Sequence, residues 1–570
     1  MVVAGGRKPP RLNEERGVGS IEQFAGGLKS TGFEGEIEDS AATLDYYSHD
    51  ASLFELRPQL VVFPRSMADL SRLVMAVNSH RKKLPHLSIT PRSAGTCMSG
   101  GAIGDSIVAD FTRHLNVIEH VEDFAAQSQP GALYREFEKV TLSHGAILPT
   151  FPASRELATL GGMVANSAGG EKSLQYGKTG DFVKRLDVVL ADGRSYIFRP
   201  LNRQELEKKK NQRDFEGEIY RQMYELLEKN YDAIKAAKPK VSKNSTGYNL
   251  WDVWDRSTGI FDLSKLFVGS QGTLGLIGDI HFRLVRQKPH SGVLVAFMKD
   301  IDQLGEIINQ VLEEKPTSFE AFDNHTLMLS IKFFPYFRKT LGWKGLFKLG
   351  WQLLPDALIL FRGIPKMVLL IEFTGDTADE VAKRVHAMRT KLEPYELEAM
   401  EEDSTEAKAW KFRIMRRESF NLLRKKVHDK HTAPFIDDFV VPPAHLVEFL
   451  PKLREIIKKY DLLATLAGHM GDGNFHVIPL MKIEDPAERA KLEPCMREVN
   501  NLVLSYGGSL SGEHNDGMVR GPWLEDMYGK AVVDLFRQTK KIFDPEGIFN
   551  PHKKTDASWE FSMSHIRQSF

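Results

Sequence analysis

The sequence contains little cysteine: Cys97 and Cys495 are the only two among 570 residues. Two thiols exclude a cysteine-ligated iron–sulfur cluster within the chain, because such a cluster needs about four. They also argue against a disulfide framework. Long apolar runs are lacking too, and no stretch of about 18 uncharged apolar residues predicts a transmembrane helix. The N-terminal segment MVVAGGRKPPRLNEERG has no apolar core of signal-peptide length. We therefore expect a cytoplasmic protein.

The sequence also lacks an excess of either charge, with 76 Lys and Arg residues against 76 Asp and Glu residues. This balance gives no indication of a nucleic-acid partner. One segment departs from it: residues 330–366 contain eight aromatic residues and seven Lys or Arg residues against one acid, Asp356. Such a composition is typical of a segment that lies in a membrane interface. The alternative is a helical insertion packed on its own domain with a basic outer face.

The stretch GHMGDGNFHVIPL (Gly468–Leu480) carries two histidines, His469 and His476, around Gly-Asp-Gly. A continuous helix is disfavoured, because each glycine in a helix interior costs about 1 kcal/mol. On a straight strand the odd spacing puts the two rings on opposite faces, so they converge only if the chain turns between them. We predict strand 462–467, a turn and strand 474–480. The pair indicates either a metal site that needs a third ligand or a hairpin that carries histidines incidentally.

A glycine-rich loop, PRSAGTCMSGG (Pro91–Gly101), lies between two predicted strands, residues 86–90 and 106–110. A Rossmann glycine loop would be followed by a helix. A loop between two strands can instead hold a diphosphate through successive backbone N–H groups, and the alternative is an ordinary glycine turn. Three further segments are rich in small residues: Phe151–Val183, Ser242–Asp255 and Leu266–Ile280. Together with the first loop they indicate an extended ligand that many loops contact.

Hydrophobic periodicity predicts the regular elements around these loops. An apolar stripe predicts a helix at Ser66–Lys83. From about residue 290 the order strand, helix, strand occurs twice, which indicates a ferredoxin-like split sheet. Its predicted elements are strand 292–300, helix 301–314, strand 318–323, strand 366–373, helix 377–392 and strand 395–400. This second domain would contain the two-histidine hairpin.

A candidate third ligand lies in SYGGSLSGEHNDGMVRG (Ser505–Gly521), where Glu513 precedes His514. Two imidazoles and one carboxylate form a ligand set that leaves positions for substrate or water. A divalent ion there acts as a Lewis acid and lowers the pKa of a bound hydroxyl from about 16 to about 7. His514 would then accept the proton, since an unperturbed imidazole titrates near pH 6.5. The alternative for Glu513 and His514 is a solvated loop pair.

Jointly, these motifs resemble the flavin-dependent D-2-hydroxy acid dehydrogenases of the vanillyl-alcohol oxidase type. That group includes D-lactate dehydrogenase, D-2-hydroxyglutarate dehydrogenase and the glycolate oxidase FAD subunit. The markers, which extend over about residues 45–555, are PRSAGT, ATLGGMVANSAGG, GYNL, GSQGTLGLI, GHMGDGNFH, SGEH and KKIFDPEGIFNPHK.

The resemblance implies an α+β fold with a two-part PCMH-type FAD-binding domain and a ferredoxin-like α/β cap domain. We expect an N-terminal extension at residues 1–40, the FAD-binding domain at 41–288 and the cap domain at 289–535, which includes the 330–366 insertion. A C-terminal segment at 536–570 is expected to return to the FAD-binding domain.

The resemblance also implies which residues bind FAD. They are Pro91, Arg92, Ser93, Ala94, Gly95 and Thr96 at the diphosphate, then Pro152, Thr159, Gly162, Ala165, Asn166 and Gly169 along the isoalloxazine ring, then Gly272 and Thr273, in a motif where Gln271 replaces the usual Glu, and finally Asn550. Members with covalent flavin often have His in the first loop. Thr96 stands there in this sequence, so we expect non-covalent FAD.

The resemblance further implies that His469, His476 and Glu513 bind Zn, Mn or Fe, and that His514 is the catalytic base. The metal and His514 would take up the hydroxyl proton of a small D-2-hydroxy acid, and a hydride would pass from its Cα to flavin N5. The product would be a 2-oxo acid.

The substrate carboxylate needs a basic partner, and a bidentate Arg suits it best. We predict Arg416 as the first choice and Lys243 as the second, with a solvated helix face as the alternative for the arginine. The D-2-hydroxyglutarate branch usually has Arg where Ser242, Lys243 and Asn244 stand, and a polar residue where Ile478 stands. We therefore favour D-lactate or a similar monocarboxylate, with D-2-hydroxyglutarate as the alternative.

The sequence ends at Phe570 without the C-terminal iron–sulfur domain of the long bacterial members of this group. Electrons are therefore expected to pass to a quinone, a separate iron–sulfur protein or another carrier, with residues 330–366 suited to the inner face of the plasma membrane. Three other functions stay open. They are a flavin oxidase of sugars or alcohols, which would not need the His/His/Glu set, a flavin-free metal hydrolase, which leaves the glycine segments unexplained, and a non-catalytic subunit of a flavin complex.

Overall fold

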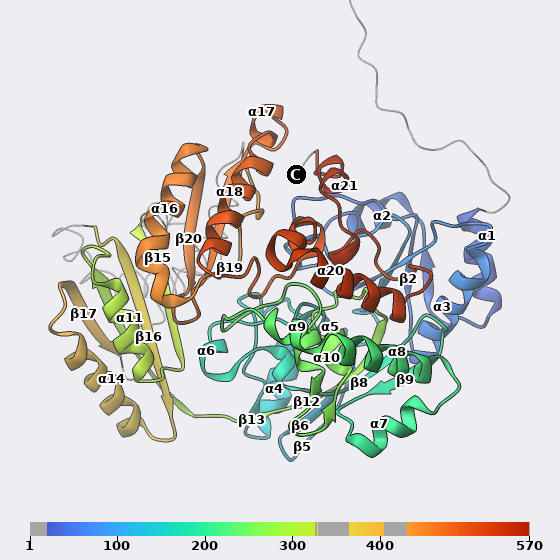
Figure 1. Ribbon diagram of the computed structural model, residues 1–570, viewed down its shortest axis with the longest axis horizontal. Helices are drawn as coiled ribbons and strands as arrows, with labels where there is room; N and C mark the ends of the chain where they lie inside the picture. Colours follow the sequence, from blue (N-terminus) through green and yellow to red (C-terminus); the bar gives the residue numbers. More distant parts are fainter. Residues whose placement is uncertain (1–19, 325, 327, 329–363, 404–429, 569–570) are drawn as a thin grey trace, which may run out of the picture.

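The structure is a computed structural model that describes residues 20–324, 326, 328, 364–403 and 430–568. The predictions for Arg416 and for most of the 330–366 insertion lie outside the described residues. Three sheets organise the described chain (Figure 1). The first two lie on the right of Figure 1, and the third lies on the left with helices over it. None of the described helices combines the length and the apolarity that crossing a membrane requires.

The first sheet surrounds the glycine-rich loop. Its strands, in spatial order, are β1 (Glu36–Glu38), β2 (Leu60–Phe63), β4 (Ile107–Asp110) and β3 (Ile89–Arg92), and the last three are parallel. The loop leads from β3 to β4, so the predicted strand–loop–strand order is confirmed. The predicted helix at 66–83 is α3 (Met67–His80), and the Ser66 hydroxyl caps it by accepting a hydrogen bond from the Asp69 N–H. Helix α1 (Ile21–Ser30) packs beside α3.

The second sheet is antiparallel and has five strands. They are, in spatial order, β5 (Ile118–Glu122), β6 (Ala125–Ser128), β12 (Leu276–Arg283), β8 (Val183–Val189) and β9 (Ser195–Phe198). The helices whose apolar side chains share its core include α4 (Tyr134–Ser143), α5 (Leu160–Asn166), α8 (Phe215–Lys229) and α20 (Leu524–Phe543). Chain segments up to residue 284 and from residue 524 onward therefore build this core.

The third sheet confirms the predicted ferredoxin-like pattern. Its first four strands are β17 (Leu397–Asp403), β14 (His290–Met298), β16 (Met367–Gly375) and β15 (Ser318–Asp323), with α11 (Leu304–Glu313) and α14 (Ala378–Leu392) in the connections. The spatial order fourth, first, third, second is that of a split β-α-β unit. The sheet continues through β20 (Leu463–His469), β21 (Asn474–Met481) and β18 (His431–Thr432), and β19 (Phe439–Val440) also pairs with β21.

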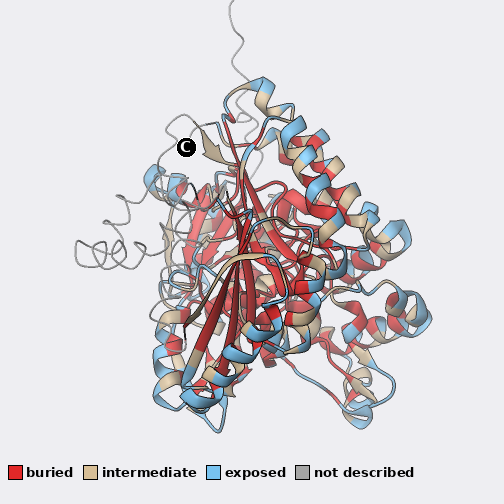
Figure 2. Ribbon diagram, turned by 90° about the vertical axis from the view of Figure 1, so that its left-hand side faces the viewer, coloured by how far each residue is buried: buried red, intermediate tan, exposed pale blue. Residues whose placement is uncertain are grey.

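Alternation along the strands gives the third sheet two different faces. On β15, Phe319 and Ala321 pack under helices that include α16 (Leu446–Lys459) and α18 (Leu492–Ser505). Ser318 and Glu320 point the other way, into a large cavity. The strands are mostly buried, whereas the helices expose their outer sides (Figure 2). On the cavity side the sheet therefore carries polar groups such as Glu320 and Glu372 among apolar ones such as Val293 and Leu370.

The C-terminal part of the chain lies against the first sheet. The Ile89 N–H donates to the Ile548 carbonyl at 2.7 Å, and the Asn550 N–H donates to the Ile89 carbonyl at 2.9 Å. Ile548 and Phe549 belong to the same apolar core as α1 and α3. Helix α21 (Trp559–Ser564) follows, and the chain then pairs Ile566 with Phe54.

Candidate functional site

A cavity of about 1140 Å³ lies between the glycine-bearing loops and the polar face of the third sheet. This volume exceeds the range of roughly 300–1,000 Å³ that is usual for small-molecule pockets. The predicted FAD-binding residues on its wall are Pro91, Arg92, Ser93, Ala94, Gly95, Thr96, Pro152, Thr159, Gly162, Ala165, Asn166, Gly169 and Gly272. His469, His476, Glu513 and His514 line the same cavity from the cap side. The structure therefore brings the two predicted groups of residues to one space.

Two of the predicted FAD-binding residues lie behind the wall rather than on it. The Thr273 hydroxyl lies 2.6 Å from the Tyr248 hydroxyl and donates to the Ser270 carbonyl. The Asn550 amide donates to the carbonyls of Gly101 and Gln271 at 2.9 and 2.7 Å. Asn550 thus joins two neighbouring glycine loops of the same cavity wall, which positions their backbones.

The space around Gly162 indicates whether a flat ligand can approach the cavity wall closely. Gly162 lies in helix α5, whose first turn is capped by the Thr159 hydroxyl. A Cβ on Gly162 would meet only Thr159 Oγ1 at 3.2 Å and Ser93 Cβ at 3.8 Å. A side chain here therefore requires only a small shift of the Thr159 hydroxyl, and glycine is otherwise unfavourable in a helix. What the glycine provides is free space at the cavity wall, which fits the FAD-binding region.

Gly162→Leu is therefore expected to abolish copurification of FAD while the protein still folds, because the new side chain fills the cavity wall. The measurement is flavin content per chain together with the melting temperature of the flavin-free protein. Gly26→Leu is the matched control, since Gly26 is also helical, lies in α1 and has nothing near its Cβ position. Full flavin content in Gly162→Leu would contradict the placement of FAD along α5.

The predicted hairpin carries His469 and His476 to one side of the third sheet, and its strand–turn–strand form is confirmed. His469 pairs with Asn474 and Ala467 pairs with His476, so the two imidazoles extend from the same face. The turn between them ends at Gly473, whose φ of +65° suits glycine. The ring centroids of the two histidines are 5.5 Å apart, and those of His476 and His514 are 5.0 Å apart.

Each of the three histidines is held at Nδ1 by a buried carboxylate. His469 Nδ1 lies 2.6 Å from Glu320, His476 Nδ1 lies 3.1 Å from Asp437 and His514 Nδ1 lies 2.6 Å from Asp437. This leaves the Nε2 atoms for other partners, and His469 Nε2 lies 3.3 Å from Glu513 Oε1. A carboxylate on the outer ring nitrogen is the usual support of a metal-ligating histidine.

Among the described residues, the geometry gathers one set of potential metal ligands, which differs in part from the predicted set. Donor atoms of Asp438, His476, Glu513 and His514 lie within 4.8 Å of one another. Asp438, however, already accepts hydrogen bonds from the backbone N–H groups of Glu513 and His514 at 2.9 and 2.6 Å. Its carboxylate therefore shapes the loop of Glu513 and His514. The predicted set shares His476 and Glu513 with this group and adds His469, whose Nε2 lies 3.3 Å from Glu513 Oε1. All three residues line the cavity, and their types fit a divalent cation.

Charges around these residues are strongly coupled. Burial lowers the pKa of His514, but Asp437 and Asp438 outweigh it and raise that pKa to about 9. Burial likewise opposes charge on His469, whereas Glu320 and Glu513 raise its pKa to about 9. A cation placed at the cavity side of these rings would oppose their protonation by repulsion. The site therefore favours positive charge, either as protons or as a metal ion.

Lys243 has different partners from those predicted for it. Its ammonium group lies 2.5 Å from Glu513 Oε1 and 3.2 Å from Asp472 Oδ2, and the side chain is only 1% exposed. Burial opposes the charge on Lys243, but Asp472 and Glu513 raise its pKa. The same pairing keeps the pKa of Glu513 well below its usual range against the effect of burial. Lys243 thus balances the negative charge of Glu513 by a buried ion pair. The predicted contact of Lys243 with a substrate carboxylate stays a prediction.

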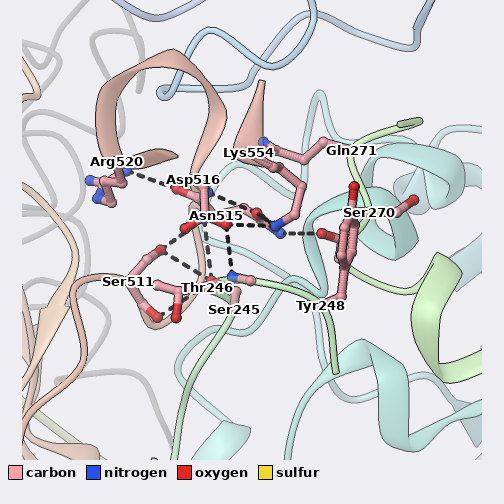
Figure 3. Close-up of polar contacts among 12 residues, drawn as sticks. Ser245, Thr246, Tyr248, Ser270, Gln271, Ser511, Asn515, Asp516, Arg520 and Lys554 are labelled. Carbon is pink, nitrogen blue, oxygen red and sulfur yellow. Dashed lines mark hydrogen bonds and ion pairs between the residues drawn. The ribbon is translucent and has the colours of Figure 1, made fainter. Parts of the chain in front are cut away.

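A buried polar network fixes the loop that carries Glu513 and His514 on the FAD-binding region (Figure 3). The Asn515 amide donates to the carbonyls of Asn166 and Gly269 at 3.2 and 2.8 Å. Asp516 accepts from the Gly247 N–H at 2.8 Å. Lys554, from the C-terminal segment, donates to Asn515 and Asp516 at 2.7 and 2.6 Å. Segments that are far apart in sequence therefore hold this loop beside the flavin-binding wall.

The sequence analysis did not single out the three supporting acids, Glu320, Asp437 and Asp438. Two adjacent acids before the buried strand β19 are a local signal, because buried carboxylates need partners. Glu320 gives a weaker signal, as a charged residue between the apolar Phe319 and Ala321 of a predicted strand. Which histidine each acid holds depends on strand pairing that the sequence does not reveal.

The arrangement of sheets and cavity defines the class of this protein as a PCMH-type FAD-binding fold with a cap, as predicted. Among solved structures, p-cresol methylhydroxylase with bound substrate matches it with a TM-score of 0.64 and 14% identity, over 95% of this chain and 96% of that chain. At this level of identity the likeness establishes the fold alone.

Residues 58–198 match the FAD binding domain family, and residues 287–554 match the family of FAD linked oxidases, C-terminal domain. The chain therefore combines the FAD-binding and C-terminal domains of the FAD-linked oxidases. D-2-hydroxyglutarate dehydrogenase of Pseudomonas putida is 29% identical over 539 residues, which is 93% of this chain and 51% of that protein. Glycolate oxidase subunit GlcD of Bacillus subtilis is 27% identical over 526 residues, with 91% and 93% covered. The resemblance to the D-2-hydroxy acid dehydrogenase group is confirmed. The chain spans about half the length of the D-2-hydroxyglutarate dehydrogenases of Pseudomonas putida and Escherichia coli.

Proposed function

We propose that the protein is an FAD-dependent oxidoreductase that oxidises a D-2-hydroxy acid to the 2-oxo acid. The observation that carries this proposal is the shared cavity, which has small-residue loops on one wall and three carboxylate-supported histidines with Glu513 on the other. A flavin-free hydrolase would not need the first wall. A flavin oxidase of sugars or alcohols would not need the second. The four groups His469, His476, Glu513 and His514 also argue against a non-catalytic subunit.

FAD would be held without a covalent link by the predicted residues of the two glycine loops and α5. When bound, FAD would accept the hydride equivalent that the substrate loses. The chain's own contribution is to keep its backbone close to the ligand, as at Gly162, and to join the loops through Asn550. We also propose that residues 41–288 form the FAD-binding domain and 289–535 the cap, with 536–570 returning to the former.

A zinc, manganese or iron ion would be held by His469, His476 and Glu513. When bound, it would act as a Lewis acid toward the substrate hydroxyl group. Glu320 and Asp437 orient the two imidazoles for this task, and Lys243 moderates the charge of Glu513. His514, which shares Asp437 with His476, would accept the hydroxyl proton at Nε2.

For the substrate we favour D-lactate or a similar small monocarboxylate. Ile478 lines the cavity on the cap side, and Glu320 and Glu372 are carboxylates on the same wall. Apolar and acidic groups suit an uncharged substrate side chain better than a second carboxylate. D-2-hydroxyglutarate is the second candidate, because it is named in the relative from Pseudomonas putida. The substrate carboxylate would pair with Arg416, since the buried ammonium group of Lys243, the second choice, already pairs with Glu513 and Asp472. The electron acceptor would be a quinone or a separate iron–sulfur protein, reached at the inner membrane face through residues 330–366 of a cytoplasmic protein.

Anaerobic bleaching of the flavin tests this proposal. The purified protein is mixed separately with D-lactate, L-lactate, D-2-hydroxyglutarate and glycolate, with and without a metal chelator, and the visible flavin band is recorded. We expect one D-acid to bleach the flavin and the chelator to prevent it. A yellow protein that none of the acids reduces would contradict the substrate class. A colourless protein that binds no added FAD would contradict the flavin enzyme itself.

A further inference from the structure

We infer that Asp437 is a positioning residue for two histidines at once, and that it sets the ring tautomer of both His476 and His514. The inference rests on the proposed function. It adds a single residue that orients both the proposed metal ligand His476 and the proposed base His514. Asp437 is 1% exposed, and each of its carboxylate oxygens contacts a different imidazole. Oδ1 lies 3.1 Å from His476 Nδ1, and Oδ2 lies 2.6 Å from His514 Nδ1.

The tautomers follow from the chemistry of an ionised carboxylate, which accepts hydrogen bonds and donates none. Both carboxylate oxygens of Asp437 lie within hydrogen-bond distance of a ring nitrogen, Oδ1 with His476 Nδ1 and Oδ2 with His514 Nδ1. Each Nδ1 must therefore carry the proton. In a neutral imidazole the lone pair is then on Nε2, which points to the cavity. His476 can ligate a cation only in this form, and His514 can accept a proton only in this form.

The sharing of one carboxylate also aligns the two rings. The imidazoles of His476 and His514 are stacked with an interplanar angle of 24° and centroids 5.0 Å apart. His469, which Glu320 holds separately, is nearly perpendicular to His476 at 87°. Asp437 thus places the proposed base parallel to one proposed metal ligand, so that both Nε2 atoms lie on the same side.

Asp437 itself is fixed by its neighbours. Strand β19 begins two residues later and pairs on one side with β21, which carries His476. On the other side Val440 pairs with Ser509, in the segment that leads to His514. The buried Arg520 guanidinium donates to the Asp437 carbonyl and to the Asn515 carbonyl. Asp437 is therefore anchored to both histidine-bearing segments by contacts that do not involve its carboxylate.

Asp437→Asn is the sharpest test, because the amide keeps the shape but offers one acceptor and one donor. One ring keeps its tautomer, and the other must present an N–H to the cavity. If His476 is the ring affected, the affinity for Zn²⁺ is expected to fall about 10- to 100-fold, as for other outer-shell partners of metal ligands. If His514 is affected, flavin reduction at saturating Zn²⁺ is expected to fall by about 10⁴, as when Asn replaces the orienting Asp of a Ser-His-Asp triad.

Two readouts separate positioning from a structural role. Zn²⁺ affinity is measured by competition with a chromophoric chelator, and flavin reduction is measured with the acid that bleaches the wild type. FAD content and melting temperature are measured beside them. Asp262→Asn is the matched control, since Asp262 is also buried and its carboxylate accepts only from Ser264 among the hydrogen bonds described, away from the cavity.

A folded Asp437→Asn protein with full FAD content and a large loss in either readout would support the inference. Unchanged Zn²⁺ affinity together with an unchanged reduction rate would overturn it. So would a loss that merely follows a loss of FAD or of melting temperature. A wild-type protein that binds no Zn²⁺ and reduces no flavin would instead contradict the proposed function, and with it this inference, so the two failures can be told apart.

Discussion

Replacing His514 by Gln is expected to slow flavin reduction by the D-2-hydroxy acid by about 10²- to 10⁴-fold, the usual contribution of a general base. FAD and metal content should stay at wild-type levels. The reason is geometric: His514 is held at Nδ1 by Asp437, its Nε2 faces the cavity, and its backbone is fixed independently by Asp438. Gln can keep a hydrogen bond in that position but cannot accept a proton near neutral pH.

Rapid-mixing measurement of flavin bleaching under anaerobic conditions gives the rate, and elemental analysis gives the metal content. His144→Gln is a suitable control, because His144 is exposed at the end of α4 and bonds only its own helix and Ser143 in the described structure. Loss of metal from His514→Gln would contradict the assignment of His514 as a base that does not bind the metal. It would mean that the ligand set includes His514, as the cluster with Asp438, His476 and Glu513 permits.

Much of this site could be predicted from the sequence because its parts are local. The turn at Gly471 and Gly473 forces the chain to reverse, so the seven-residue spacing of His469 and His476 brings the rings together. Gly162 of α5 leaves space at the cavity wall, whereas the glycines of the first loop allow close packing against other side chains, as Gly95 does against Arg92. Periods of two and of 3.6 residues were sufficient to predict the ferredoxin-like strands and helices to within a few residues.

The supporting residues could not be predicted in this way, because their partners are distant in sequence. Asp437 acts on His476 and on His514, and Lys243 acts on Glu513, 270 positions away. Lys243 also illustrates how a correct observation can give an incomplete interpretation. A lysine near a candidate substrate site suggests a carboxylate partner, and the carboxylate that it contacts in the structure belongs to the protein.

Replacing Lys554 by Met is expected to lower the free energy of unfolding by about 3–5 kcal/mol, the typical cost of leaving one partner of a buried ion pair uncompensated. Lys554 and Asp516 are both fully buried, and their charged groups are 2.6 Å apart. Burial opposes the ammonium charge and lowers the pKa of Lys554, although Asp516 works in the opposite direction. Removing the ammonium would leave the Asp516 carboxylate in the interior with the Gly247 N–H as its remaining described partner.

Denaturant unfolding, followed by circular dichroism and by flavin fluorescence, measures this loss. Lys530→Met provides the comparison, because Lys530 forms an exposed pair with Asp534 at 2.8 Å and should cost at most about 1 kcal/mol. The double variant Lys554→Met with Asp516→Asn should be less destabilised than Lys554→Met alone, since the uncompensated charge is then absent. Equal destabilisation of the single and double variants would show that lost packing, and not charge, accounts for the effect.

Lys554→Met should also slow flavin reduction, because Asp516 follows His514 by only two residues. Without Lys554, the loop that carries the base is less firmly held beside Gly269 and Asn166.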